Sequence, residues 1–176
     1  VGGYVEISDS YLDAMTDLTI TAGRYITAIS SVLGGYDGTV TVDAATEFVE
    51  LARTRVEATE IEIEGHTDVS IRAGSILDTT LIPNGGAISV NAETGSILVD
   101  TSAIRSAGSA TLTAANNVDM LTSTVTARDD ITIAAAAGAI NLESTTLTST
   151  TGGIALGAGD DVDITAGSDL YADGDV

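Results

Sequence analysis

Residues 110–130 read ATLTAANNVDMLTSTVTARDD, and within them apolar and polar residues alternate in three short segments. In the first two segments, the pairs Ala110/Leu112 and Val118/Met120 each enclose one polar residue. Alternation with a period of two is typical of a β-strand that buries one of its faces. The segments are separated by Asn, Asp and small residues, which favour tight turns. This stretch therefore predicts three short strands joined by sharp corners.

The same three-part pattern recurs about every 22 residues along the whole chain, a period typical of solenoid proteins. The first apolar position of successive units is occupied by Leu18, Val40, Ile61, Ile88, Ala110, Ile131 and Ile154. The second position is occupied by Ile26, Val49, Val69, Ile97, Val118, Ile140 and Val162. We assign the third position to Val32, Val56, Ile76, Ile104, Val125, Leu147 and Leu170.

We therefore predict an all-β fold over residues 1–176, a single right-handed parallel β-helix (β-solenoid) with three strands per coil. Each coil has about 22 residues, and the chain forms about seven to eight coils. The long step from Ile61 to Ile88 predicts a corner insertion near 78–86, which contains the single proline. Elsewhere, Gly, Asn and Asp occupy the corners before the first and second strands, where we expect left-handed backbone conformations.

Hydroxyl side chains precede the third apolar position by two residues in almost every coil. Because alternation points them inward beside a corner, we expect them to form a ladder that satisfies buried polar groups. The predicted structural ladder consists of Ser10, Ser30, Thr54, Ser102, Ser123, Thr145 and Ser168, with Gly74 at the remaining position.

The composition excludes several classes of function. With 26 acidic residues, six basic residues and a net charge of −20, the chain repels nucleic acid and anionic lipid. Cysteine is absent, which excludes disulfides and thiolate metal sites. No apolar run approaches the roughly 20 residues of a membrane-spanning helix, so we expect no membrane insertion.

Three segments, residues 110–120, 130–142 and 153–170, resemble filamentous haemagglutinin-type repeats. Such repeats build the shafts of large bacterial exoproteins and adhesins that are exported by two-partner secretion. The resemblance covers nearly the whole chain and rests on the spacing of apolar residues, Thr, Ala and Gly. It implies a secreted or cell-surface, extracellular location and a structural role.

Acidic corners are the candidate metal ligands, because Ca²⁺ prefers several oxygen ligands on flexible backbone. The residues are Asp129, Asp130, Asp160, Asp161, Asp173 and Asp175. Solvation of charged corners is the simpler interpretation, and we predict no other cofactor.

An enzymatic role would require paired carboxylates, and a dense acidic cluster lies between Glu47 and Glu64. Polysaccharide-active β-helix enzymes also need a cleft and aromatic platforms, yet this chain has one Phe and no Trp. The single His66 has no second histidine with which to share a metal. We therefore expect no enzyme activity, and we place a polysaccharide-active enzyme third among the hypotheses.

Both ends of the predicted solenoid are expected to be uncapped, because no polar capping element is recognisable there. The chain is then either a window of a longer exoprotein or a subunit that stacks end-to-end on copies of itself through open β-edges. Our leading hypothesis is a non-enzymatic shaft or filament subunit of a fibre or adhesin. The alternative is a ligand-binding solenoid that uses acidic corners for Ca²⁺ or a lateral face for cell-surface glycan or protein.

Overall fold

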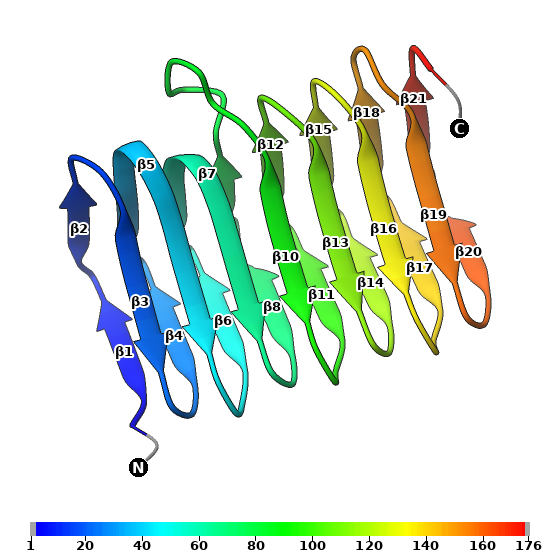
Figure 1. Ribbon diagram of the computed structural model, residues 1–176. Coiled ribbons are helices and arrows are strands. Elements are labelled where there is room, and N and C mark those ends of the chain that lie inside the picture. Colours follow the sequence, from blue (N-terminus) through cyan, green and yellow to red (C-terminus); the bar gives the residue numbers. More distant parts are fainter. Residues whose placement is uncertain (1–2, 175–176) are drawn as a thin grey trace.

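The computed structural model describes residues 3–174, which form 21 β-strands and no helix (Figure 1). The chain passes through three strands in each coil, and each coil stacks in parallel on the one before. The three strand positions create three lateral faces, which we name in the order of the predicted apolar positions. Within the described part, no helix is long and apolar enough to cross a membrane. The predicted all-β parallel solenoid is confirmed.

The second face is a sheet with one strand from each of eight coils, so the described residues span about eight turns. Its strands are β1 (Val5–Ser8), β4 (Ile26–Ile29), β6 (Val49–Ala52), β8 (Val69–Arg72), β11 (Ile97–Asp100), β14 (Val118–Leu121), β17 (Ile140–Glu143) and β20 (Val162–Thr165).

The first and third faces belong to one 13-stranded sheet, because β5 (Val32–Ala44) and β7 (Arg55–Gly65) run through the corner between them. The first face also contains β3 (Leu18–Ala22), β10 (Ile88–Ala92), β13 (Ala110–Ala114), β16 (Ile131–Ala135) and β19 (Ile154–Ala158). The third face also contains β2 (Tyr11–Ala14), β9 (Ile76–Asp78), β12 (Ala103–Ser106), β15 (Thr124–Ala127), β18 (Thr146–Ser149) and β21 (Asp169–Ala172).

The strand register confirms the first two predicted apolar columns at every coil. On the first face, Ala110 pairs with Ile88 on one side and with Ile131 on the other. On the second face, Val118 is aligned in the same way between its neighbouring coils. These residues are fully buried, and the aliphatic columns form one continuous core along the rod axis.

The third column differs from the prediction in two coils. The register aligns Leu33 and Leu77 with Val56, whereas Val32 and Ile76 are one residue out of phase and partly exposed. In both coils two apolar residues are adjacent, so alternation alone does not identify the inward one. The inward residue depends on the preceding corner, which is one residue longer before Leu77 because Gly74 is inserted there.

The left-handed residues lie at a different corner from the one expected. Among the described residues, positive φ angles occur between the second and third faces in every coil, and at one further site, Asn84. Most of these residues are not glycine, for example Arg53 (φ 51°) and Thr101 (φ 50°). Several corner glycines elsewhere, such as Gly95 and Gly138, are needed for a different reason, since they lie against the backbone of the preceding coil.

Residues 79–87 form the one loop that leaves the regular coil, between β9 and β10, and it projects at the top of Figure 1. Its position corresponds to the insertion expected near 78–86. Asp78, at the base of the loop, is buried and accepts hydrogen bonds from the backbone and hydroxyl of Thr80.

Candidate functional site

A column of hydroxyl side chains lies inside the solenoid at the corner between the second and third faces. Its members are Ser10, Ser31, Thr54, Ser75, Ser102, Ser123, Thr145 and Ser168, and the six between the two ends of the column are buried. Two positions correct the prediction: Ser31 replaces Ser30, and Ser75 occupies the position assigned to Gly74. Ser30 instead adopts a left-handed conformation (φ 52°) and is exposed.

Each hydroxyl of this column donates a hydrogen bond to the carbonyl two or three residues earlier in its own coil. Thr145 shows the full arrangement: its Oγ1 donates to the carbonyls of Met120 (3.0 Å) and Glu143 (3.1 Å), and its N–H donates to Ser168 Oγ (3.1 Å). Within the described residues, no buried side-chain polar atom lacks a partner. The hydroxyl column therefore serves the structure, because its hydroxyls are committed to backbone groups.

We expect Thr145→Val to lower the free energy of unfolding by about 1–3 kcal/mol, because the isosteric side chain loses the buried hydroxyl's hydrogen bonds to the carbonyls of Met120 and Glu143. Thr148→Val is the matched control on β18, since in the described part its hydroxyl makes no hydrogen bond; we expect a change within about 0.5 kcal/mol. Chemical denaturation followed by circular dichroism measures both. Equal effects of the two substitutions would show that the column does not stabilise the fold.

The predicted calcium ligands lie at two different corners. Asp129 and Asp130 occupy the corner between the third and first faces, and the exposed Asp173 follows β21 at the same kind of corner. Asp160 and Asp161, both exposed, lie at the corner between the first and second faces. Asp175 lies outside the described residues.

Two of these carboxylates have protein partners. Arg128 hydrogen bonds to Asp129 (3.1 Å), which lowers the pKa of that carboxyl, and Asp130 Oδ1 accepts the backbone N–H of Gly153 in the next coil (2.8 Å). In residues 3–174, no group of three or more His, Asp or Glu side chains is placed to hold a metal ion. Calcium binding stays a prediction, which calorimetric titration tests: absence of both heat and a shift in melting temperature would contradict it.

The acidic cluster of the sequence is divided among the faces of the rod. Glu47 pairs with Arg24 (2.8 Å) at a corner, Glu50 pairs with Arg72 and Glu57 pairs with Arg55. The Arg24–Glu47 and Arg72–Glu50 pairs join neighbouring coils, whereas Arg55 and Glu57 lie on the same strand. Because these side chains are at least partly exposed, each pair contributes little to stability. Sequence spacing did not reveal the Arg24–Glu47 pair, because the two residues are neighbours only after a full coil.

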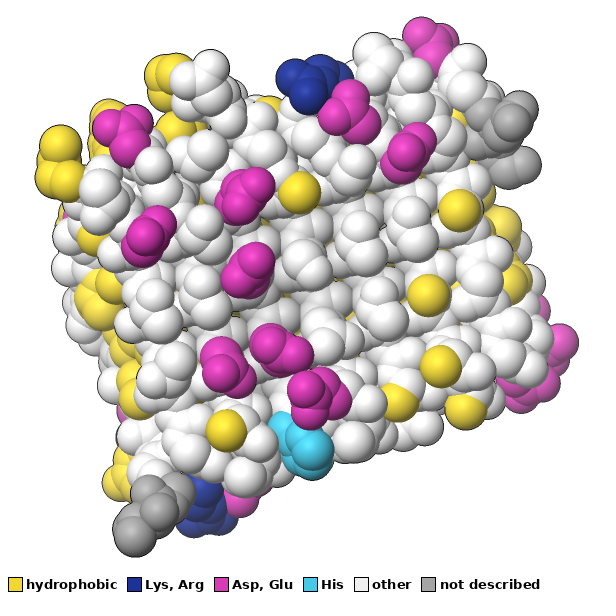
Figure 2. Space-filling model, in the orientation of Figure 1, with side chains coloured by type: hydrophobic (Ala, Val, Ile, Leu, Met, Phe, Trp, Pro, Cys, Tyr) yellow, Lys and Arg dark blue, Asp and Glu magenta, His cyan; other side chains and the backbone are white. Residues whose placement is uncertain are grey.

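The remaining acidic side chains give the first face its charge. Figure 2 shows Asp and Glu side chains over β5 and β7 and beyond the end of β10, next to a surface of small and hydroxyl residues. Asn91 Nδ2 donates to Glu64 Oε1 across this face (3.1 Å), and His66 Nδ1 contacts Glu93 at its edge (2.7 Å). A surface depression of about 330 Å³ is lined by Glu62, Ile63, Glu64, Ser89, Asn91 and Thr113.

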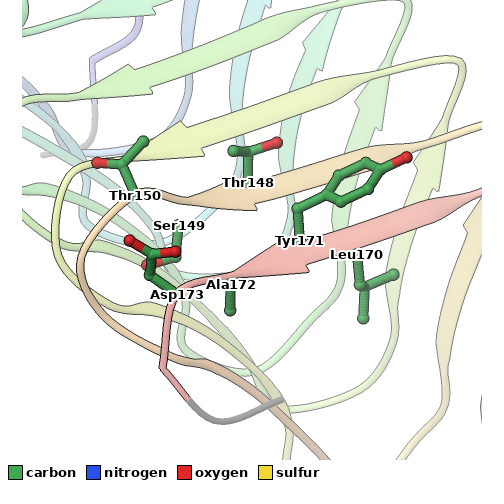
Figure 3. A pocket seen from close by; sticks show the side chains of 7 residues that line it. All are labelled: Thr148, Ser149, Thr150, Leu170, Tyr171, Ala172 and Asp173. Carbon is green, nitrogen blue, oxygen red and sulfur yellow. The ribbon is translucent and has the colours of Figure 1, made fainter.

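A second depression, of about 530 Å³, lies between the last two strands of the third face (Figure 3). Figure 3 shows Thr148 and Tyr171 on the outer side, whereas Leu170 and Ala172 point to the opposite, core side. The hollow thus follows the edge of β21, and its lining resembles the general surface of the rod rather than a cleft with converging polar groups.

Three aromatic rings stack along the corner between the first and second faces. Tyr4 and Tyr25 lie 5.1 Å apart between ring centroids, and Tyr25 and Phe48 lie 5.2 Å apart, with nearly parallel planes. The spacing follows from in-register coils, which place equivalent side chains one strand separation apart. The Tyr25 hydroxyl donates a hydrogen bond to Glu6 (3.1 Å).

Burial raises the pKa of the Tyr25 phenol above its ordinary value, and the hydrogen bond to Glu6 raises it further. The folded state therefore favours the neutral phenol, so this stabilisation is present below the pKa of the unfolded chain and is lost as the pH rises through the folded pKa. We expect Tyr25→Phe to reduce this alkaline loss of stability, and Glu6→Gln to bring the Tyr25 titration, followed by tyrosinate absorbance, to lower pH. The prediction would be wrong if Tyr25→Phe left the alkaline loss of stability unchanged and Glu6→Gln left the tyrosinate titration unchanged.

Comparison with known proteins finds no match: no family model matches the chain, and no curated protein or solved structure is significantly similar to it. The geometry establishes a parallel β-solenoid repeat protein.

Proposed function

We propose that this chain is a non-enzymatic structural module: a stiff segment of the shaft of a secreted or cell-surface fibre or adhesin of the filamentous haemagglutinin type. The observation that supports the proposal is the uninterrupted stacking of coils. On the first face, one register continues from β3 to β19 and pairs backbone groups between every two neighbouring coils. A solenoid of this kind grows in one direction and holds its two ends at a fixed separation.

The side chains support the same role. Polar side chains also link neighbouring coils, as in the hydrogen bonds of Thr145 N–H to Ser168 Oγ and of Gly153 N–H to Asp130. The outer surface is acidic and hydroxyl-rich, which keeps an elongated rod soluble and separate from its neighbours. With a coil spacing of about 4.8 Å, seven steps between eight coils give a length of roughly 34 Å.

We propose that a further coil covers the last described one. Val162 and Ile164 belong by register to the buried column of the second face, yet they are 41% and 45% exposed. The covering strand comes either from further coils of the same chain or from a second copy. Electron microscopy of the purified chain separates the two: micrometre fibres indicate stacking of copies, and discrete short rods indicate a segment of a longer shaft.

Immunogold electron microscopy of the source cells tests the function itself, with antibody raised against the folded chain. We expect label on surface projections or on shed fibres, and none with pre-immune serum. Label confined to the cytoplasm would contradict the extracellular role. For the enzymatic alternative, hydrolysis of a polysaccharide that Glu60→Gln or Glu62→Gln abolishes would overturn the proposal.

A further inference from the structure

Large apolar side chains are exposed in the first two coils, at the insertion loop and in the last described coil. Tyr11 is 71% exposed, Met15 76% and Tyr36 58%, and Leu81 in the insertion loop is 57% exposed. In contrast, residues 82–161, all of them described, expose no Val, Ile, Leu, Met or aromatic side chain. A plain shaft needs no such residues, and exposed Tyr, Met and Leu on one side of a molecule are typical of surfaces that bind other proteins. We name these four residues the apolar edge.

The apolar edge lies on the third face and on its corner with the first face. Ala14 pairs with Gly35, so Met15 and Tyr36 occupy equivalent positions in neighbouring coils, about 4.8 Å apart. Tyr11 points outward from the same strand as the inward Leu12. Figure 2 shows apolar side chains along the corresponding upper left margin, above the N-terminal strands and at the insertion loop.

The loop that carries Leu81 is firmly anchored on both neighbouring coils. Gly86 donates its N–H to Thr59 of the coil before it (2.6 Å), and its carbonyl accepts from Ser106 Oγ of the coil after it (3.0 Å). Thr79 Oγ1 also donates to the Gly86 carbonyl (2.9 Å). The base of the loop is therefore fixed on both neighbouring coils, which limits the backbone freedom of Leu81 and reduces the entropy lost on binding.

The charges around the apolar edge indicate which partner fits. Asp13, Asp17 and Asp37 flank Met15 and Tyr36, all three are exposed, and none of them forms an ion pair within the described residues. A second copy would bring the same acidic rim and a net charge of −20 against it, and like charges across an interface oppose association. A partner that presents basic side chains around an apolar pocket would bury the apolar edge and also neutralise the charge of the acidic rim.

We propose that the apolar edge is a docking surface for another protein, one with an apolar pocket surrounded by Lys and Arg side chains. This inference goes beyond the shaft function and does not depend on it. Tyr36 and Leu81 are the expected anchors, because large exposed side chains that a partner buries dominate binding energy. The acidic rim, formed by Asp13, Asp17 and Asp37, attracts the basic side chains of the partner at a distance, and salt weakens this attraction.

The test uses two fluorescein-labelled peptides of equal charge, one of alternating Leu and Lys and one of alternating Ser and Lys. We expect the Leu/Lys peptide to bind the natural chain about tenfold more tightly than the double variant Tyr36→Ser/Leu81→Ser. The Ser/Lys peptide should bind both proteins with equal, weaker affinity. Tyr171→Ser is the matched control, since it removes a tyrosine of similar exposure (57%) at the far end, and should bind like the natural chain.

Equal affinity of the Leu/Lys peptide for the natural chain and the double variant would overturn the proposal, because binding would then be due to charge alone. A dimer that ultracentrifugation detects in the natural chain, and that the double variant loses, would also overturn it in favour of a second copy. Both substituted side chains point outward, so the melting temperature should be unchanged. If it is not, the single variant Met15→Ser provides the same comparison.

Discussion

Replacing Leu112 with Ala is expected to lower the free energy of unfolding by about 2–5 kcal/mol, the range found for buried leucines in well-packed cores. Leu112 is fully buried at the middle of the rod and is aligned in register between Val90 and Ile133. The truncated side chain leaves a cavity that these two neighbours can fill only by moving their own strands. Urea unfolding followed by circular dichroism measures the loss.

The position of Leu112 adds a second expectation. In a solenoid each coil contacts only its neighbours, so a weakened central interface uncouples the two halves of the rod. We expect the unfolding transition of Leu112→Ala to become broader as well as earlier. Thr113→Ala is the control on the same strand, because Thr113 is exposed, and its effect should stay within about 0.5 kcal/mol. Equal losses from the two substitutions would show that the assignment of inner and outer residues on β13 is wrong.

The repeat in the sequence predicts most of the fold, because each apolar column is repeated seven or eight times and an ambiguity at one position does not change the register of the others. The ambiguities that persist are local. Val32 and Leu33 are both apolar, and only the pairing of Leu33 with Val56 identifies which of them faces the core. Once that residue is known, the hydroxyl column includes Ser31 and Ser75, and all eight positions hold Ser or Thr. The error at Ser75 came from the corner that Gly74 lengthens, and the error at Ser31 came from the choice between two adjacent apolar residues.

The candidate sites were less predictable, because their chemistry depends on residues about 22 positions away. Asp130 looks like a free corner carboxylate in sequence, yet it accepts the backbone N–H of Gly153 in the next coil. Asp68 and Asn117 accept N–H groups of the following coil in the same manner. Nothing in the local sequence distinguishes such a residue from a ligand. The apolar edge was also missed, since Met15 and Tyr36 become neighbours only after stacking.

Corner glycines provide the second large expected effect. Gly95 lies at the corner between the first and second faces, where a Cβ would overlap the carbonyl oxygen of Thr67 in the preceding coil and lie 2.5 Å from its carbonyl carbon. Backbone atoms of a stacked coil cannot move aside like a flexible side chain. We therefore expect Gly95→Ala to force the two coils apart and to destabilise the protein by about 1–3 kcal/mol.

Gly157→Ala is the matched control, because a Cβ there has no atom within 4 Å and the backbone conformation suits any residue. Removing a glycine from such a site restricts the unfolded chain, so this substitution should stabilise the protein by about 0.4–1 kcal/mol. Thermal and urea unfolding of the two variants measure both changes in stability. If Gly95→Ala were also neutral or stabilising, the coils would not stack as closely as described. Stability changes of opposite sign in the two variants would instead show that Gly95 is required by the coil beneath it and not by its own backbone angles.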